Sequence, residues 1–235
     1  MSERKLQGLE PESVFRYFEE ICAIPHGSRN TKSISDYLVS FAKAHGLRYR
    51  QDESNNVVIF APGTCGLEDH ESVILQGHMD MVCEKNNDVE HDFLVDPIET
   101  EIDGEWMKAK GTTLGADNGI GVATELAILA DDTIEHGPLE CLFTVDEETG
   151  LTGAFALKEG FMNGDILLNL DSEDEGELFI GCAGGIDSVA QFTYKEADVP
   201  AGYFFFKVEV KGLKGGHSGG DIHLGRGNAN KILNR

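Results

Sequence analysis

The sequence predicts an α/β fold with a mixed or parallel central sheet flanked by helices. Two amphipathic helical segments open the chain, and short apolar strands then alternate with a further helical segment. After about residue 186, alternating β-like segments and a glycine-rich loop replace this order. We therefore expect one domain over residues 1–186 and the beginning of a second domain over residues 187–235.

Three helices are predicted in the first domain from apolar residues that recur every three or four positions. The first covers residues 11–24, where Pro11 suits the opening turn. The second covers residues 31–45 and stops at Gly46. A third helix begins near Gly119, so helical segments stand on both sides of the predicted strands in the sequence.

Four strands are predicted from short apolar runs, and the run over residues 72–77 is typical of a buried strand. The four strands cover residues 56–60, 72–77, 139–145 and 165–170. In the second domain, residues 187–194 and 203–211 alternate in a β manner, and a helix begins near Asn228. The sequence stops about two turns into that helix, which we interpret as an interruption.

Charge and composition exclude several classes of protein. The 235 residues carry a formal charge of -23, which argues against nucleic acid or anionic membranes as partners, since both are polyanions. The five cysteines include no CxxC pair, the first residues include no signal-peptide segment, and no apolar run is long enough to span a membrane. We expect a reduced, cytoplasmic protein.

Four short motifs supply the candidate functional residues. They are QGHMD (76–80), GADNGIG (115–121), DEETG (146–150) and NLD (169–171), and they contain His78, Asp80, Asp117, Glu147, Glu148 and Asp171. Three of the motifs follow predicted strands, whose carboxyl ends form the ligand-binding edge of an open α/β sheet. A two-metal hydrolase site needs a histidine, a bridging carboxylate, terminal carboxylates and one unbound carboxylate as base. The combination predicts such a site.

Each motif alone also has a purely structural interpretation. His78 suits a hydrogen-bonded histidine at a strand end, although Asp80, two residues on, is placed to orient an imidazole ligand. Asp117 suits a helix cap, and its loop has no lysine for binding phosphate. Glu147 and Glu148 suit a solvated turn. The occurrence of all four motifs together favours the metal site.

Two further histidines, His217 and His223, lie in the glycine-rich segment 212–227. Their spacing differs from that of helical zinc motifs. Two interpretations remain open for this segment: a flexible loop, or a mobile histidine that donates to a developing oxyanion.

Longer motifs resemble a known family, the aminoacylhistidine dipeptidases (Xaa-His dipeptidase, or peptidase D). This family belongs to the zinc-dependent aminoacylase, carboxypeptidase and dipeptidase group. The motifs are QGHMDMVCEKN (76–86), KGTTLGADNGIG (110–121), FTVDEETGLTGA (143–154), NLDSEDEGELFIGCAGG (169–185) and KGLKGGHSGGDIHLGRGNAN (211–230). The resemblance implies a zinc-peptidase-like catalytic domain with an inserted α+β lid domain.

The resemblance also implies a set of metal ligands. His78 and Asp171 would bind one Zn²⁺, Asp117 would bridge both ions, and Glu148 would bind the second. Asp80 would orient His78. Cobalt or manganese would be accepted as substitutes, because carboxylate and histidine sites bind them too.

Catalytic roles follow from the same resemblance. Glu147 would be the general base, and His217 of the lid would hold the substrate or oxyanion. The peptide bond between Asp117 and Asn118 would be cis. The implied substrates are unblocked dipeptides, especially Xaa-His and the β-alanyl-histidine type, and the lid would form a homodimer.

One family feature is missing from these 235 residues: a histidine near the C-terminus that completes the second zinc site. The chain therefore resembles an N-terminal half, and we expect it to bind the second zinc poorly and to be inactive alone. Two alternatives stay open. One is a related carboxypeptidase or N-acyl amino acid deacylase, and the other is a catalytically incomplete fragment that binds metal or dimerises.

Overall fold

The structure, a computed structural model, describes residues 4–172, 175–182, 184–186, 188–216 and 220–235. The chain divides into two units, Met1–Ile180 and Gly181–Arg235. The first unit contains α1 (Glu12–Cys22), α2 (Lys32–Ala44), β1 (Arg48–Gln51), β2 (Val57–Ala61), β3 (Val73–His78), β4 (Thr100–Asp103), β5 (Trp106–Ala109), α3 (Ala116–Leu129), β6 (Leu139–Thr144), the 3₁₀ turn η1 (Glu147–Thr149), α4 (Thr152–Ala156) and β7 (Ile166–Asn169). The second contains the 3₁₀ turn η2 (Ile222–Leu224) and α5 (Ala229–Asn234).

The central sheet has five strands in the order β1-β2-β6-β3-β7. β1, β2 and β6 pair antiparallel, whereas β3 pairs parallel with both β6 and β7. The predicted mixed sheet flanked by helices is therefore confirmed. Because β6, β3 and β7 run the same way, the segments that follow them leave from the same edge of the sheet.

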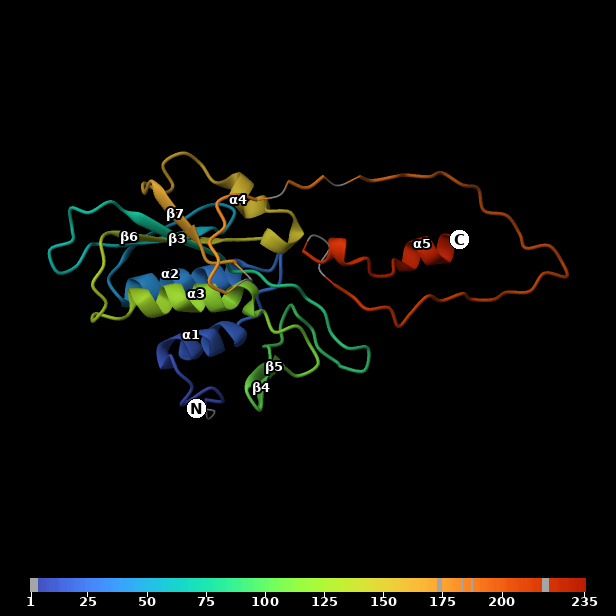
Figure 1. The fold of residues 1–235 in the computed structure, drawn as a ribbon, viewed down its shortest axis with the longest axis horizontal. Helices are drawn as coiled ribbons and strands as arrows, with labels where there is room; N and C mark the ends of the chain where they lie inside the picture. The colour runs from blue at the N-terminus through green and yellow to red at the C-terminus, as the bar shows by residue number, and fades with distance from the viewer. Residues whose placement is uncertain (1–3, 173–174, 183, 187, 217–219) are drawn as a thin grey trace. The chain divides into compact units, whose positions relative to one another are not determined.

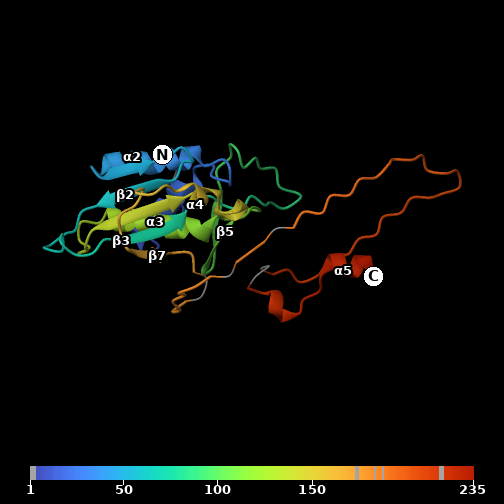
Figure 2. The ribbon, with the colours of Figure 1, turned by 90° about the horizontal axis from the view of Figure 1, so that it is seen from above.

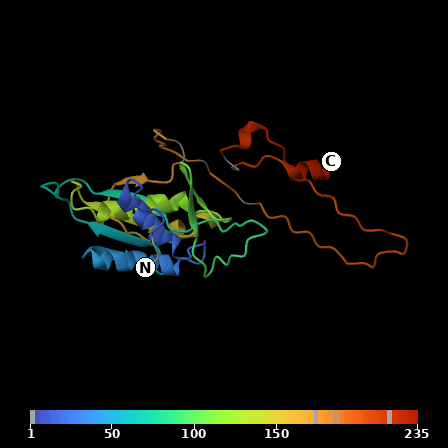
Figure 3. The same cartoon turned by 90° about the horizontal axis from the view of Figure 1, so that it is seen from below.

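The three long helices cover one face of this sheet (Figure 1). α2 packs along β1 and β2, and α3 packs along β3 (Figure 2). α1 packs on α3 and forms an outer layer, and the helical face is turned toward the viewer in Figure 3. α3 therefore lies between the outer helix and the strand that ends at His78.

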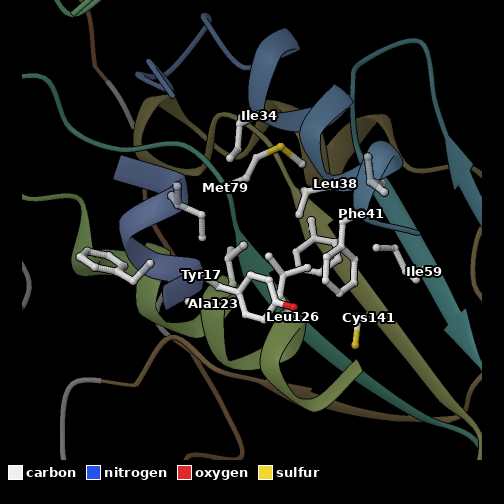
Figure 4. Close-up of a cluster of buried hydrophobic side chains, with 14 of the residues drawn as sticks. Tyr17, Ile34, Leu38, Phe41, Ile59, Met79, Ala123, Leu126 and Cys141 are labelled. Atoms are coloured by element: carbon white, nitrogen blue, oxygen red, sulfur yellow. The ribbon is translucent and has the colours of Figure 1, made fainter. Parts of the chain in front are cut away.

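The main core lies between these helices and the sheet (Figure 4). Side chains from α1, α2 and α3 meet alternate residues of the strands, such as Ile59 of β2 and Cys141 of β6. The intervening residues Val58 and Leu142 face the other side, where they pack with Leu157. Burial on both faces explains why β2 is an uninterrupted apolar run and why most residues of β6 are apolar.

The sequence prediction missed three strands and added two. β1 and the β4–β5 hairpin are polar and largely exposed, so their sequences lack an apolar pattern. Conversely, the described residues of 187–194 and 203–211 form no strand, so that prediction was wrong. An alternating sequence becomes a strand only when a neighbouring strand supplies hydrogen bonds.

In the second unit, the predicted helix near Asn228 is confirmed as α5. The Lys231 amide donates to Asn228 Oδ1 at 3.0 Å, which caps the helix. The assignment of residues 187–235 to a lid domain stays a prediction. None of the helices formed by the described residues has the length and hydropathy needed to cross a bilayer.

Replacing Leu126 by alanine tests the packing of α3. Its side chain is fully buried in the main core, so Leu126→Ala should lower the free energy of unfolding by about 2–5 kcal/mol. The same change at Leu94, which is 67% exposed, should cost less than about 0.5 kcal/mol. Urea denaturation of both variants checks this, and equal losses would contradict the assigned packing of α3.

Candidate metal centre

The predicted site residues come together at the carboxyl edge of the parallel strands. His78 ends β3, and the turn η1 with Glu147 and Glu148 follows β6. Asp171 lies two residues beyond the end of β7, and Asp117 lies in the first turn of α3. Neighbouring strands in register thus deliver the side chains from separate segments to one place.

A compact group of ligand atoms forms around His78. Among the residues that the structure describes, His78, Asp117 and Glu148 make the one group of three whose ligand atoms all lie within 4.8 Å of one another. His78 Nε2 lies 3.1 Å from Asp117 Oδ1 and 3.6 Å from Asp171 Oδ2. The arrangement presents one imidazole nitrogen to several carboxylate oxygens.

The imidazole of His78 is held by the main chain. Its ring is buried, and Nδ1 lies 3.0 Å from the carbonyl oxygen of Asp80. A carbonyl oxygen only accepts, so Nδ1 carries the proton and donates it to this bond. Nε2 therefore faces the carboxylates of Asp117 and Asp171, and it is the nitrogen available to a metal ion.

The carboxylate of Asp80, unlike its main-chain carbonyl, holds the turn that carries the two glutamates. Ser28 Oγ donates to Asp80 Oδ2 at 2.7 Å, and the Glu147 amide donates to Oδ1 at 3.0 Å. The Glu148 amide at 3.4 Å and His78 Nδ1 at 3.5 Å are longer contacts. Burial raises the pKa of Asp80, but these donors outweigh it, so the net shift is downward and the carboxylate stays ionised.

Asn118 connects two of the predicted ligands. The peptide bond between Asp117 and Asn118 is cis, as the resemblance implied. The Asn118 amide nitrogen donates to the carbonyl oxygen of Leu170 at 2.8 Å and to Asp171 Oδ1 at 3.1 Å. The start of α3 is thereby joined to the end of β7.

The electrostatics of the group favour a cation. Burial opposes protonation of His78, but Asp80, Asp171 and Asp117 together raise its pKa to about 9. Burial and the adjacent Asp117 carboxyl raise the pKa of Asp171 to about 6. Burial and Asp117 also raise the pKa of Glu148. The raised pKa values of His78, Asp171 and Glu148 share one cause, which is that negative charge is crowded here without enough positive charge to balance it. A bound cation would supply that positive charge.

The donor set fits a divalent metal ion. Imidazole nitrogen and carboxylate oxygens are ligands of zinc, and they also suit cobalt and manganese. In ion pairs among the described residues, His78 is the only basic partner of Asp80, Asp117 and Asp171. No lysine or arginine is therefore paired with these acids in the part of the chain that the structure describes.

Two further histidines were candidates in the sequence, and two residues that contact the predicted site residues were not predicted. His217 lies outside the described residues, and His223 is exposed in η2 of the second unit. Ser28 was missed because it lies 52 positions before its partner Asp80, with no local pattern to mark it. Asn118 stands within the GADNG motif, but a polar side chain there gave no sign of its contact with Asp171.

A protein-family model matches the part of the chain that contains this site. The model for peptidase family M20/M25/M40 matches residues 74–217, which include every candidate ligand. The cytosol non-specific dipeptidase of Escherichia coli (strain K12) is 52% identical over 231 residues, which are 98% of this chain and 48% of that protein. The chain spans about half the length of the curated relatives it matches.

Solved structures give the same comparison. The aminoacylhistidine dipeptidase of Vibrio alginolyticus superposes with a TM-score of 0.75 at 47% identity, covering 97% of this chain and 46% of that one. A tripeptidase of Staphylococcus aureus superposes with a TM-score of 0.58 at 24% identity, covering 70% and 44% of the two chains. The second likeness concerns the fold alone.

Replacing Ser28 by alanine tests the support of the turn. Ser28→Ala removes the 2.7 Å hydrogen bond to Asp80, so the turn that carries Glu148 should be held less firmly. Loss of such an outer contact should weaken zinc binding about tenfold. The control is Ser40→Ala on α2, whose hydroxyl donates only to the Asp36 carbonyl oxygen. Zinc titration with a competing chelator measures both, and equal affinities would contradict this role.

Proton release on metal binding tests the charge state. At about pH 7.5, His78 holds a proton in the metal-free protein, because its pKa is about 9, so binding of a metal should release about one proton. At about pH 5, Asp171, with a pKa of about 6, is protonated as well, so about two protons should be released and affinity should fall. Calorimetry in buffers of different ionisation enthalpy measures the number. No release at the higher pH would show that His78 is neutral there.

Proposed function

The chain belongs to peptidase family M20/M25/M40, and from this premise we propose that it carries the metal centre and general base of a dipeptidase. The observation that carries the proposal is the group formed by His78, Asp117 and Glu148, with Glu147 beside it on the same turn. The proposed substrates are unblocked dipeptides. The two relatives that are 52% and 47% identical to this chain over the aligned residues are named as dipeptidases.

The proposed metal is zinc, bound as a pair. His78 and Asp171 would hold one ion and Glu148 the other, and the Asp117 carboxylate would be shared between them. The short distances from His78 Nε2 to Asp117 and Asp171 support the first part of this assignment. The exposed Asp117 carboxylate, on the first turn of α3, is accessible to both positions.

The chain's own residues perform the proton transfers. When bound, the metal ions polarise the scissile carbonyl and lower the pKa of a water molecule. Glu147 takes the proton of that water and later gives it to the departing amine. Asp80 positions Glu147 through the main-chain amide, which leaves the Glu147 side chain available for this transfer. We also propose that His217 donates to the oxyanion.

The names of the relatives bear on substrate and location. One is named a non-specific dipeptidase and the other an aminoacylhistidine dipeptidase, so we propose activity on dipeptides in general that includes Xaa-His and the β-alanyl-histidine type. Because the first is named a cytosol enzyme, we propose a cytoplasmic location. The homodimer formed through the lid is likewise a proposal.

A second candidate is a unit that binds metal without turnover. The described residues provide one group of three mutually close ligands, which is sufficient for one tightly bound ion rather than two. In that case the chain takes up one zinc firmly and the second weakly. The two candidates differ in stoichiometry and in activity, so one series of measurements separates them.

The test combines zinc titration with an assay of free dipeptides. Wild type should bind zinc, whereas Asp117→Ala should lose at least about 100-fold in affinity, because the bridging ligand is gone. Asp69→Ala, an exposed aspartate elsewhere in the unit, serves as the control and should bind as wild type. The sequence resemblance predicts that this chain alone is inactive, so hydrolysis of Ala-His but not of N-acetylated amino acids by the zinc-loaded chain would contradict that expectation and support the dipeptidase. The reverse preference would indicate a deacylase, and firm zinc binding without hydrolysis would indicate the second candidate.

The two adjacent glutamates should respond differently to the same substitution. Glu147→Gln should keep the zinc affinity of wild type and lower hydrolysis by about 10²–10⁴-fold, because only the proton acceptor is removed. Glu148→Gln should weaken zinc binding by about 10–100-fold, because a ligand is changed. Affinity and turnover are measured for both variants, and each serves as the control for the other. Loss of zinc by Glu147→Gln would contradict its assignment as the base.

A further inference from the structure

Two buried polar groups beside the metal centre lack a strong hydrogen-bond partner. Glu125 on α3 is fully buried, and among the described residues its carboxyl group has only the Cys141 thiol, a weak donor, as a hydrogen-bond partner. Asn118 Oδ1, also buried, has no partner among these residues. Buried acceptors without donors are costly, by about 1–3 kcal/mol each. Their coincidence on one helix therefore calls for an explanation.

The two groups face the same point beside Gly77 of β3. A Cβ atom placed on Gly77 would lie 2.4 Å from Asn118 Oδ1 and 3.1 Å from Glu125 Oε1. A Cβ atom on Gly121 would also lie 2.4 Å from Asn118 Oδ1. The absence of side chains at these two positions is what admits the oxygens. Gly77 directly precedes His78, so this point adjoins the metal centre.

The orientation of the Asn118 amide is fixed by its other contacts. Its nitrogen donates to the Leu170 carbonyl oxygen and to Asp171 Oδ1. Turning the amide over would place its oxygen against these two acceptors, which is unfavourable. Asn118 Oδ1 therefore faces Gly77 and needs a donor there.

Glu125 supplies a donor only as a neutral acid, because an ionised carboxylate has acceptors alone. Burial raises the pKa of Glu125 well above its ordinary value, and the neighbouring Cys141 thiol acts in the opposite direction. Cys141 is itself buried in β6, on the core face of the sheet (Figure 4). With no cation paired to it among the described residues, the carboxyl group keeps its proton.

We propose that Glu125 is a positioning residue of the metal centre, whose hydroxyl donates to Asn118 Oδ1 and so fixes the amide that holds Asp171. The donation is direct or passes through one buried water, and both place a donor at the point beside Gly77. Since Asn118 also follows Asp117 in the chain, one amide sets the position of two ligands. The inference rests on the proposed function in that Asp117 and Asp171 are taken as ligands.

Two substitutions separate positioning from packing. Glu125→Gln keeps the shape and supplies a permanent N–H donor, whereas Glu125→Met has a similar volume and no donor. Zinc affinity is measured by chelator competition in the 235-residue chain. The glutamine variant should stay within about threefold of wild type, and the methionine variant should bind about tenfold more weakly. Urea denaturation should find the methionine variant less stable than the glutamine variant, because Asn118 Oδ1 is then buried without a donor.

Two further measurements need no metal. Infrared spectra should contain a protonated carboxyl band that Glu125→Gln removes at neutral pH. The side-chain amide resonances of Asn118 should shift in Glu125→Met and much less in Glu125→Gln. If wild type binds no zinc, the proposed function fails, whereas these two readouts still decide the role of Glu125. If the methionine variant does not fold, Glu125→Leu takes its place.

Three results would overturn the inference. The first is equal zinc affinity in the glutamine and methionine variants. The second is the absence of a protonated carboxyl band assigned to Glu125. The third is an Asn118 amide that responds in the same way to both substitutions, as expected if Glu125 only fills space.

Discussion

The parallel pairing of β3 with β6 and β7 is the constraint on which the rest of the first unit depends. Its register sets His78 opposite Thr144 and Gln76 opposite Asn169, so three chain segments leave the sheet side by side. Side chains that follow these strands, and that are far apart in sequence, therefore meet at this edge. A slip of β6 by one residue would move each of its side chains to the opposite face of the sheet. Because β6 is buried on both faces, every one of those side chains would then lose its packing partners.

The acids at this edge fall into two electrostatic classes. Asp80 is buried but receives short hydrogen bonds from Ser28 and the Glu147 amide, so its charge is stabilised by the protein itself. Asp171 receives one hydrogen bond from Asn118, but burial and the Asp117 carboxyl outweigh it, and the pKa values of both Asp171 and Glu148 are raised. The protein thus stabilises the negative charge of Asp80, the carboxylate that holds the turn, and leaves the other carboxylates to attract a cation.

Sequence patterns indicated the parts of this molecule that depend on local composition. The apolar runs of β2, β3, β6 and β7 and the periodicity of α1 and α2 are local, and the ligand candidates stood out because polar residues follow apolar strands. β1 lies on the sheet edge, and Arg48 and Gln51 have no apolar pattern. Ser28 and Glu125 act through contacts made only in the folded chain, and neither the spacing nor the residue type marked them in the sequence.

The division of labour within Asp80 has a consequence for how such a centre changes over evolutionary time. The tautomer of His78 is set by the main-chain carbonyl of residue 80, which every amino acid possesses. The hydrogen bond to His78 Nδ1 is therefore kept in any replacement at position 80 that leaves the backbone in place. The position of the turn that carries Glu147 and Glu148 depends on the Asp80 carboxylate, and it is lost when that carboxylate is removed. Drift at this position would therefore separate the two tasks, retaining an intact imidazole ligand while the reactive carboxylates lose their alignment.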